Sequence, residues 1–184
     1  MAGGAGAEAG RTWSGRLLGD AAVDLDLRPA WRLDDAVLEQ DAIEFWKRMG
    51  ILPTGVSVEE RVRELAAGAY RDGRLVGVAT AVIAPVEALR CKFAFYRCAV
   101  AEEERRSLAS TALTVFTRDL IERWSAENPD EGVLGLAAII ESSALQQRQR
   151  DPLWANSGLN LVAFTSKGKQ LRVAWFRHAR VPVG

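Results

Sequence analysis

The sequence predicts an α/β protein in which a single mixed central β-sheet is flanked by helices. The first observation is an apolar run, residues 93–100, that leads through a short charged loop into an amphipathic segment at 107–124. The second is another apolar run, 133–140, which lacks alternation and is typical of a strand buried on both faces. The third is a pair of hairpin signals, one on each side of this unit, which indicate further antiparallel strands.

Residues 93–140 form the centre of the predicted fold. The segment 107–124 carries apolar residues at three- and four-residue steps, as a helix with one buried face does: Ala109, Ala112, Leu113, Phe116, Leu120 and Trp124. A strand, one crossover helix and a second strand make a right-handed parallel unit. The loop entering such a helix offers unpaired N–H groups and the positive end of the helix dipole, which predicts a phosphate site.

Three elements are predicted before this unit and its first hairpin. Residues 21–27 alternate apolar and acidic side chains, as a half-exposed strand does, and Arg28-Pro29 is expected to end that strand. A first helix is predicted at 34–49, with an aspartate as its N-cap. A capping box that begins at Ser57 starts a second helix, 57–70, whose buried side would be Val58, Val62, Leu65, Ala66 and Ala69.

The two predicted hairpins and one short helix complete the fold. Residues 75–83 and 91–100 are rich in strand-forming side chains and are expected to pair in antiparallel fashion. After the central unit, 141–150 is predicted as a short helix, and 159–165 and 170–181 as strands joined by a tight turn. We expect a flexible N-terminal segment over residues 1–20 and one domain over 21–184.

Bulk composition excludes several classes of function. The 184 residues are 48% hydrophobic and 26% charged, which is ordinary for a globular protein with a real core. The formal net charge is zero, so we expect no nucleic-acid partner and no membrane partner. The N-terminus lacks the basic and apolar regions of a signal peptide, which favours a cytoplasmic location.

The cysteines and the histidine indicate no metal or redox centre. Cys91 and Cys98 lie too far apart along one predicted strand to form a disulfide, so reduced thiols are expected. His178 is the only histidine, and its position matches no metal-ligand spacing. We therefore expect no metal cofactor.

The order of these elements resembles the GCN5-related N-acetyltransferase (GNAT) fold over about residues 21–182. Two local patterns carry the resemblance. The family's pyrophosphate loop, Gln/Arg-x-x-Gly-x-Gly/Ala, aligns with residues 104–109, where Ser107 replaces a glycine and Glu104 or, in a loop one residue shorter, Arg105 takes the first position. The family's frequent Tyr-x-x-x-Gly-Phe aligns with Trp154-Ala-Asn-Ser-Gly158-Leu159.

The resemblance implies an acyl-CoA cosubstrate, acetyl-CoA or another acyl-CoA, held between the family's fourth and fifth strands. The residues implied in cofactor binding are Cys98, Ala99 and Val100 for pantetheine, and Arg105, Arg106, Ser107, Leu108 and Ala109 for pyrophosphate. An opposing interpretation remains for this loop. Its three glutamates, residues 102–104, would favour the positive end of the helix and repel a pyrophosphate.

Candidate acceptor-binding residues come from two elements. Tyr96 and Arg97 point to opposite faces of one strand, so one is expected to line a substrate pocket while the other packs under a helix. The alternatives are a core aromatic for Tyr96 and half of a buried ion pair for Arg97. Trp46 ends the first helix, where the family borders its acceptor site; the alternative is a core residue.

Glu141 is the candidate catalytic residue. It follows the parallel strand at its carboxyl end, where ligands of open parallel sheets collect, and a carboxylate there is placed to act as general base. The alternative is a solvated side chain next to Ser142 or Ser143, one of which caps the following helix. Trp154 occupies the position of the family's tyrosine acid, and an indole cannot supply that proton.

The resemblance implies an acyl-CoA-dependent N-acyltransferase that transfers an acyl group directly to the amine of a small molecule or peptide. The alternative is a degenerate GNAT-like protein without acyltransferase activity, which serves as a binding or structural module. A homodimer through the last strands is a candidate arrangement for that module.

Overall fold

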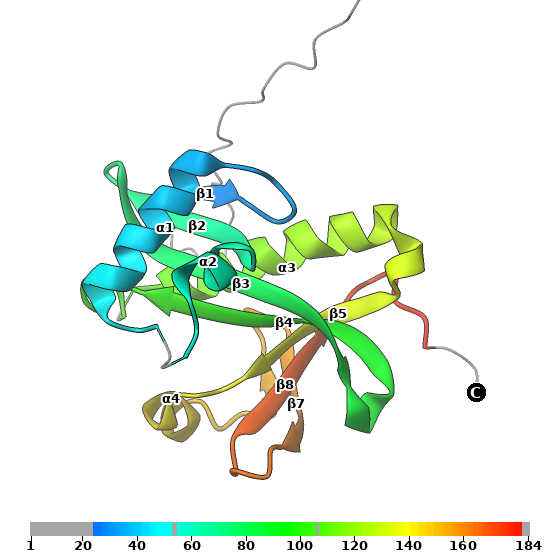
Figure 1. The fold of residues 1–184 in the computed structure, drawn as a ribbon. Coiled ribbons are helices and arrows are strands. Elements are labelled where there is room, and N and C mark those ends of the chain that lie inside the picture. The colour runs from blue at the N-terminus through cyan, green and yellow to red at the C-terminus, as the bar shows by residue number, and fades with distance from the viewer. Residues whose placement is uncertain (1–23, 53–54, 106, 182–184) are drawn as a thin grey trace, which may run out of the picture.

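Eight strands form one mixed sheet in the part of the chain described by this computed structural model, residues 24–52, 55–105 and 107–181. The strands are β1 (Asp26–Pro29), β2 (Leu65–Arg71), β3 (Arg74–Val86), β4 (Cys91–Val100), β5 (Val133–Ile139), β6 (Leu153–Trp154), β7 (Leu159–Phe164) and β8 (Gln170–Trp175). Their order in the sheet is β1-β2-β3-β4-β5-β8-β7-β6 (Figure 1). The pair β4–β5 is parallel, and the remaining pairs are antiparallel.

Helices cover both faces of this sheet. They are α1 (Ala36–Met49), α2 (Val58–Val62), α3 (Ala109–Glu127) and α4 (Ser143–Arg148), and 3₁₀ turns lie at 87–89, 102–104 and 129–131. The helices α1 and α2 lie on one face of the sheet, and α3 lies on the other (Figure 1). Two glycines mark these close contacts: a Cβ at Gly68 would lie 2.5 Å from Leu38 of α1, and one at Gly77 would lie 3.5 Å from Leu113 of α3. None of the helices described is long and apolar enough to cross a membrane.

The predicted central unit is confirmed. The helix α3 crosses over between the parallel strands β4 and β5, and its Ala109, Ala112 and Leu113 are fully buried. The other predicted stripe residues, Phe116, Leu120 and Trp124, are partly buried and pack against the same core. Asn128-Pro129 ends the helix as expected, because proline cannot continue it.

The predicted second helix is wrong beyond its first turn. Its capping box is present, since the Ser57 hydroxyl accepts a hydrogen bond from the Glu60 amide, but α2 ends at Val62. Residues 65–71 form β2 instead, and every position from Leu65 to Tyr70 is buried. A continuously apolar run satisfies a helical and a strand period equally, so periodicity alone could not separate the two structures. The length of the run and its internal glycine are the signals that favour a strand.

Smaller differences concern the two edges of the sheet. The first strand ends at Pro29, as expected, but Arg28 and Pro29 are themselves its last residues, paired with β2, and the strand begins only at Asp26. Proline is tolerated there because β1 is an edge strand. The predicted hairpin β7–β8 is confirmed, although β8 ends at Trp175 rather than at residue 181. The segment 1–20, predicted to be flexible, lies outside the described residues.

The strands β4 and β5 diverge, and this divergence positions the candidate site. They pair from Lys92 and Val133 up to Phe95 and Ala137, and their register ends there. Beyond this point β4 continues beside β3 as far as Val100, while β5 continues beside β8. The remaining half of β4 therefore presents one backbone edge to a gap in the sheet (Figure 1).

Candidate active site

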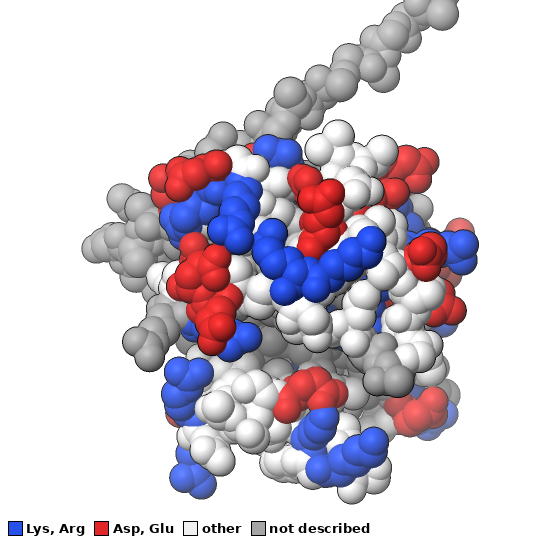
Figure 2. All heavy atoms as spheres, turned by 60° about the vertical axis from the view of Figure 1, so that its left-hand side comes forward, with Lys and Arg blue, Asp and Glu red and all other residues white. Residues whose placement is uncertain are grey.

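A cavity of about 740 Å³ occupies the gap between β4 and β5. One end is lined by Ser110, Thr111 and Thr114 from the first turns of α3, and the opposite end by Trp46, Ile51 and Leu52 at the end of α1 and just after it. Residues 96–99 of β4 and 138–140 at the end of β5 line the passage between these ends. The cavity therefore reaches both faces of the sheet. On the side where β4 and β5 diverge, basic and acidic side chains are interspersed (Figure 2).

The strand β4 supplies four of the predicted site residues to this cavity, because its side chains alternate between the faces of the sheet. Tyr96 and Cys98 point toward α3, and Arg97 and Ala99 point toward α1 and α2. Cys91 and Cys98 are free thiols, as expected. Val100, the remaining predicted pantetheine residue, is partly buried and packs against the core rather than lining the cavity.

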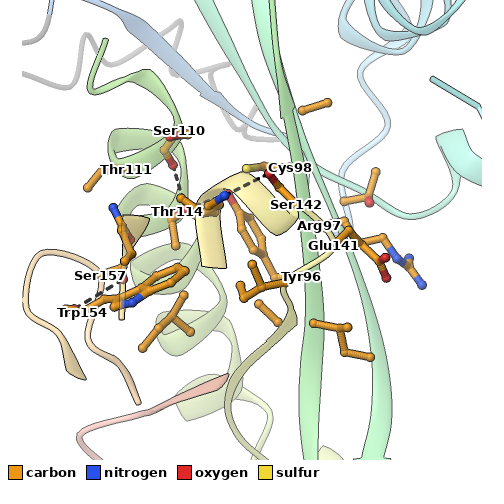
Figure 3. Close-up of a pocket in the computed structure, with 18 of the residues that line it drawn as sticks. Tyr96, Arg97, Cys98, Ser110, Thr111, Thr114, Glu141, Ser142, Trp154 and Ser157 are labelled. Atoms are coloured by element: carbon orange, nitrogen blue, oxygen red, sulfur yellow. Dashed lines mark hydrogen bonds between the residues drawn. The ribbon is translucent and has the colours of Figure 1, made fainter. Parts of the chain in front are cut away.

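Tyr96 combines the two roles that the sequence left as alternatives. Its ring is buried against α3 and also lines the cavity (Figure 3). Its hydroxyl lies 3.0 Å from the Thr114 Oγ1, and that hydroxyl donates its own proton to the Ser110 carbonyl at 2.7 Å. Tyr96 is therefore the donor to Thr114. Burial raises the pKa of Tyr96 well above its ordinary value, so the phenol stays protonated at neutral pH.

In the predicted pyrophosphate loop, the side chain of Ser107 bonds backbone groups of the loop itself. The Ser107 hydroxyl donates to the Glu104 carbonyl at 2.9 Å and accepts from the Ala109 amide at 3.0 Å. Ala109 is fully buried, and Arg105 and Leu108 are exposed. Arg106 lies outside the described residues. The cavity wall begins one residue later, at Ser110 and Thr111, which the sequence analysis missed although they belong to the same first helical turn.

The three glutamates of this loop are each paired with an arginine. Glu104 is buried and bonds bidentately to Arg71, at 2.7 and 3.3 Å. Arg74 lies 3.8 Å from Glu103, and Arg105 lies 3.3 Å from Glu102. The hydrogen bonds from Arg71 hold the pKa of the Glu104 carboxyl below its usual value, with a further contribution from Ser107. The repulsion that the sequence analysis expected between this loop and a phosphate is therefore largely neutralised.

The Glu104–Arg71 pair predicts a defined pH dependence of stability. Because the pKa of Glu104 is lower in the folded state, its contribution is present above the unfolded carboxyl pKa of about 4.3 and is lost as the pH falls through the folded value. Glu104→Gln is expected to lower the free energy of unfolding at pH 7 by about 1–3 kcal/mol. It should also flatten the decline of stability below about pH 4.3, measured by urea unfolding at several pH values. Glu102→Gln is the control, because its side chain is 81% exposed; identical profiles for Glu104→Gln and wild type would contradict the role of the pair.

Glu141, the candidate base, lies at the rim of the cavity. Its side chain lines the cavity, is 68% exposed and forms an ion pair with Lys169 of the β7–β8 turn. Ser142 caps α4, since its hydroxyl accepts from the Leu145 amide at 3.2 Å, as one alternative expected. A water-accessible carboxylate beside the passage can take a proton directly or through a water.

Trp154 forms the wall opposite β4, and a buried arginine holds it there. The Arg172 guanidinium lies 4.1 Å from the Trp154 ring and donates to the carbonyls of Asp151, Pro152 and Leu159 at 2.8–3.3 Å. Arg172 is fully buried, and burial lowers its pKa. No sequence pattern indicates this contact, because an arginine in a strand next to a tight turn normally faces solvent.

Trp46 and Arg97 both line the α1–α2 end of the cavity, and their role in binding an acceptor stays a prediction. Trp46 is buried and lines the cavity, so its core and pocket interpretations both apply. Arg97 lines the cavity and pairs with Glu64 at 3.3 Å. Within the described ranges, no group of three or more His, Cys, Asp and Glu side chains is placed to hold a metal ion.

Comparison with known proteins identifies the fold. The sequence matches no protein-family profile and no curated protein sequence. The chain is similar to the GNAT domain of PAT from S. lividans, with a TM-score of 0.55 and 11% identity over 84% of this chain and 92% of that one. It is similar to a GNAT-family acetyltransferase from Streptococcus pneumoniae, with a TM-score of 0.51 and 11% identity over 81% and 96% of the two chains. It is also similar to a putative acetyltransferase from Salmonella typhimurium, solved with acetyl-CoA, with a TM-score of 0.51 and 14% identity over 87% of this chain and 99% of that one. The chain therefore has the GNAT fold, and the predicted fold class is confirmed.

Proposed function

We propose that this protein is an acyl-CoA-dependent N-acyltransferase, with acetyl-CoA as the acyl donor. The observation that carries the proposal is the single cavity that passes through the gap between β4 and β5. A donor that enters from the α3 end and an acceptor that enters from the α1–α2 end meet beside residues 96–99. The Salmonella typhimurium structure of the same fold, solved with acetyl-CoA, supports the choice of donor.

The chain offers a fit for each part of coenzyme A. The edge of β4 at Cys98, Ala99 and Val100 has no register partner in β5, so its backbone groups can bond the pantetheine amides as an added strand would. We place the pyrophosphate at the start of α3, on first-turn amides and on the hydroxyls of Ser110 and Thr111. Arg105, Ser107 and Leu108, which precede this turn, would border that site; the predicted role of Ala109 reduces to its place in the first turn, and that of Arg106 stays a prediction from the sequence.

The proposed chemistry requires two proton transfers. The acceptor nitrogen attacks the thioester carbonyl carbon and the carbon–sulfur bond breaks, so that an amide forms and the CoA thiolate leaves. Glu141, directly or through a water, is our candidate to take the proton that the amine loses. Tyr96 is our candidate to give a proton to the thiolate once its hydroxyl turns from Thr114 toward the donor, because its side chain lines the cavity and Trp154 cannot act as an acid.

Tyr96→Phe tests this assignment by turnover. With an amine that supports thiol release from acetyl-CoA, the variant is expected to lower kcat about 10-fold with little change in KM, since water partly replaces the lost acid. Loss of the bond to Thr114 should cost about 1 kcal/mol of stability. Tyr70→Phe is the matched control, because Tyr70 is the other of the two tyrosines and bonds Asp41 of α1. Unchanged kcat in Tyr96→Phe would remove Tyr96 from the mechanism.

A further inference from the structure

Two arginines share one carboxylate at the α1–α2 end of the cavity. The same oxygen of Glu64, Oε2, accepts from Arg61 at 2.6 Å and from Arg97 at 3.3 Å. Arg61 is 11% exposed and Arg97 is 57% exposed, and both line the cavity. Two cations against one anion leave this cluster with a formal charge of +1. Glu64 thus fixes both guanidinium groups while Arg97 keeps free donor capacity on its exposed side.

We propose that the acceptor is a free α-amino acid with an apolar side chain, whose carboxylate binds Arg97; this inference rests on the proposed acyltransferase function. A guanidinium presents its donors as a planar fork that matches a carboxylate, which makes arginine the residue suited to such a group. The exposed guanidinium of Arg97 is available for this contact, whereas Arg61 is held by Glu64 at the shorter distance.

The groups that surround Arg97 favour a zwitterion over a simple anion. Glu141 lies at the rim of the cavity, where it pairs with Lys169, and Asp151 also lines the cavity, so the carboxylate of Asp151 is available for an ammonium group. Figure 3 shows Arg97 and Glu141 on the same side of the passage, away from Trp154. Arg148 lines the cavity as well, so the charged groups along the cavity are of both signs. An acceptor that carries both a carboxylate and an amine complements this arrangement.

The remaining wall at this end indicates the side chain. Trp46 is buried, and Ile51 and Leu52 follow it along the end of α1 and the next loop. An aliphatic or aromatic side chain placed against these three residues would bury its apolar surface away from water, which is favourable.

Calorimetric titration of amino acids into the CoA-saturated protein tests the inference. The probes are L-leucine and L-phenylalanine, their amides, and the decarboxylated amines isoamylamine and phenethylamine. We expect the amino acids to bind at least about 10-fold more tightly than either analogue, because only they offer a carboxylate to Arg97. Arg97→Gln should abolish this difference. Arg63→Gln, an equal change of charge at an exposed position outside the cavity lining, should preserve it.

The outcomes separate this inference from the proposed function. Equal binding of acids, amides and amines, or binding of none of them, overturns it even when CoA binds. So does a preference for acids that survives in Arg97→Gln. Preference for the amides would instead indicate a peptide N-terminus as acceptor. If CoA itself does not bind, the acyltransferase proposal fails, and the same titrations on the CoA-free protein still decide whether Arg97 holds a carboxylate.

Discussion

An aspartate in place of Ala112 is expected to unfold the domain. Ala112 is fully buried, with a relative exposure of 0%, and it lies on the face of α3 that packs against the sheet. A carboxylate there would be buried without a partner, which costs about 4 kcal/mol or more out of the roughly 5–15 kcal/mol that stabilise a typical domain. Circular dichroism melting and urea unfolding measure the loss.

Ala126→Asp is the matched control for this prediction. Ala126 is an exposed position near the end of the same helix, so the same side chain should cost less than about 1 kcal/mol there. A melting temperature of Ala112→Asp within a few degrees of the control would contradict the packing of α3 against the sheet. It would also contradict the position of the cavity, which the first turns of α3 line.

A glutamate in place of Thr111 is expected to weaken CoA binding by about 30-fold or more. Thr111 lies in the first turn of α3 and lines the cavity where we place the pyrophosphate. Two like charges 4 Å apart repel by about 4 kcal/mol at a surface dielectric, and half of that already gives about 30-fold. Glutamate in a first helical turn is itself favourable, so the melting temperature of the free protein should change little. Calorimetric titration of CoA gives the affinity.

The control for Thr111→Glu adds the same charge elsewhere. Ala36 is the first residue of α1, is exposed and lies outside the cavity lining, so Ala36→Glu places a glutamate in a first helical turn far from the proposed phosphate site. Equal CoA affinity in the two variants would show that the start of α3 does not hold the pyrophosphate.

The fold was largely predictable because the local sequence signals in its central unit all favour the structure that forms there. The stripe of α3, the breaker at Asn128-Pro129 and the apolar strands around them each favour the same structure. The failure at 65–71 has a physical origin, since a strand buried on both faces leaves no alternation to detect. The predicted order therefore lacked a strand at the position where the structure has β2.

The residues of the candidate site were predictable only where a local sequence pattern or motif indicates them. Strand alternation predicted that either Tyr96 or Arg97 lines a pocket, and the family resemblance implied Cys98 and Ala99; all four line the cavity. Glu64, Arg71 and Arg172 were not predicted, because their roles depend on partners 20 or more positions away. The pairing of Arg71 with Glu104 changes the electrostatics of the loop, and no local signal indicates it.

Thermal melting of the wild-type protein with and without CoA and acetyl-CoA tests the central claim most directly. A ligand present at about 100 times its Kd adds about 2.7 kcal/mol to stability, which gives a measurable rise in Tm. We predict such a rise for both compounds, because both carry the pyrophosphate and pantetheine that the cavity is proposed to hold. No rise at millimolar ligand would contradict acyl-CoA binding and favour the alternative of a GNAT-like binding module.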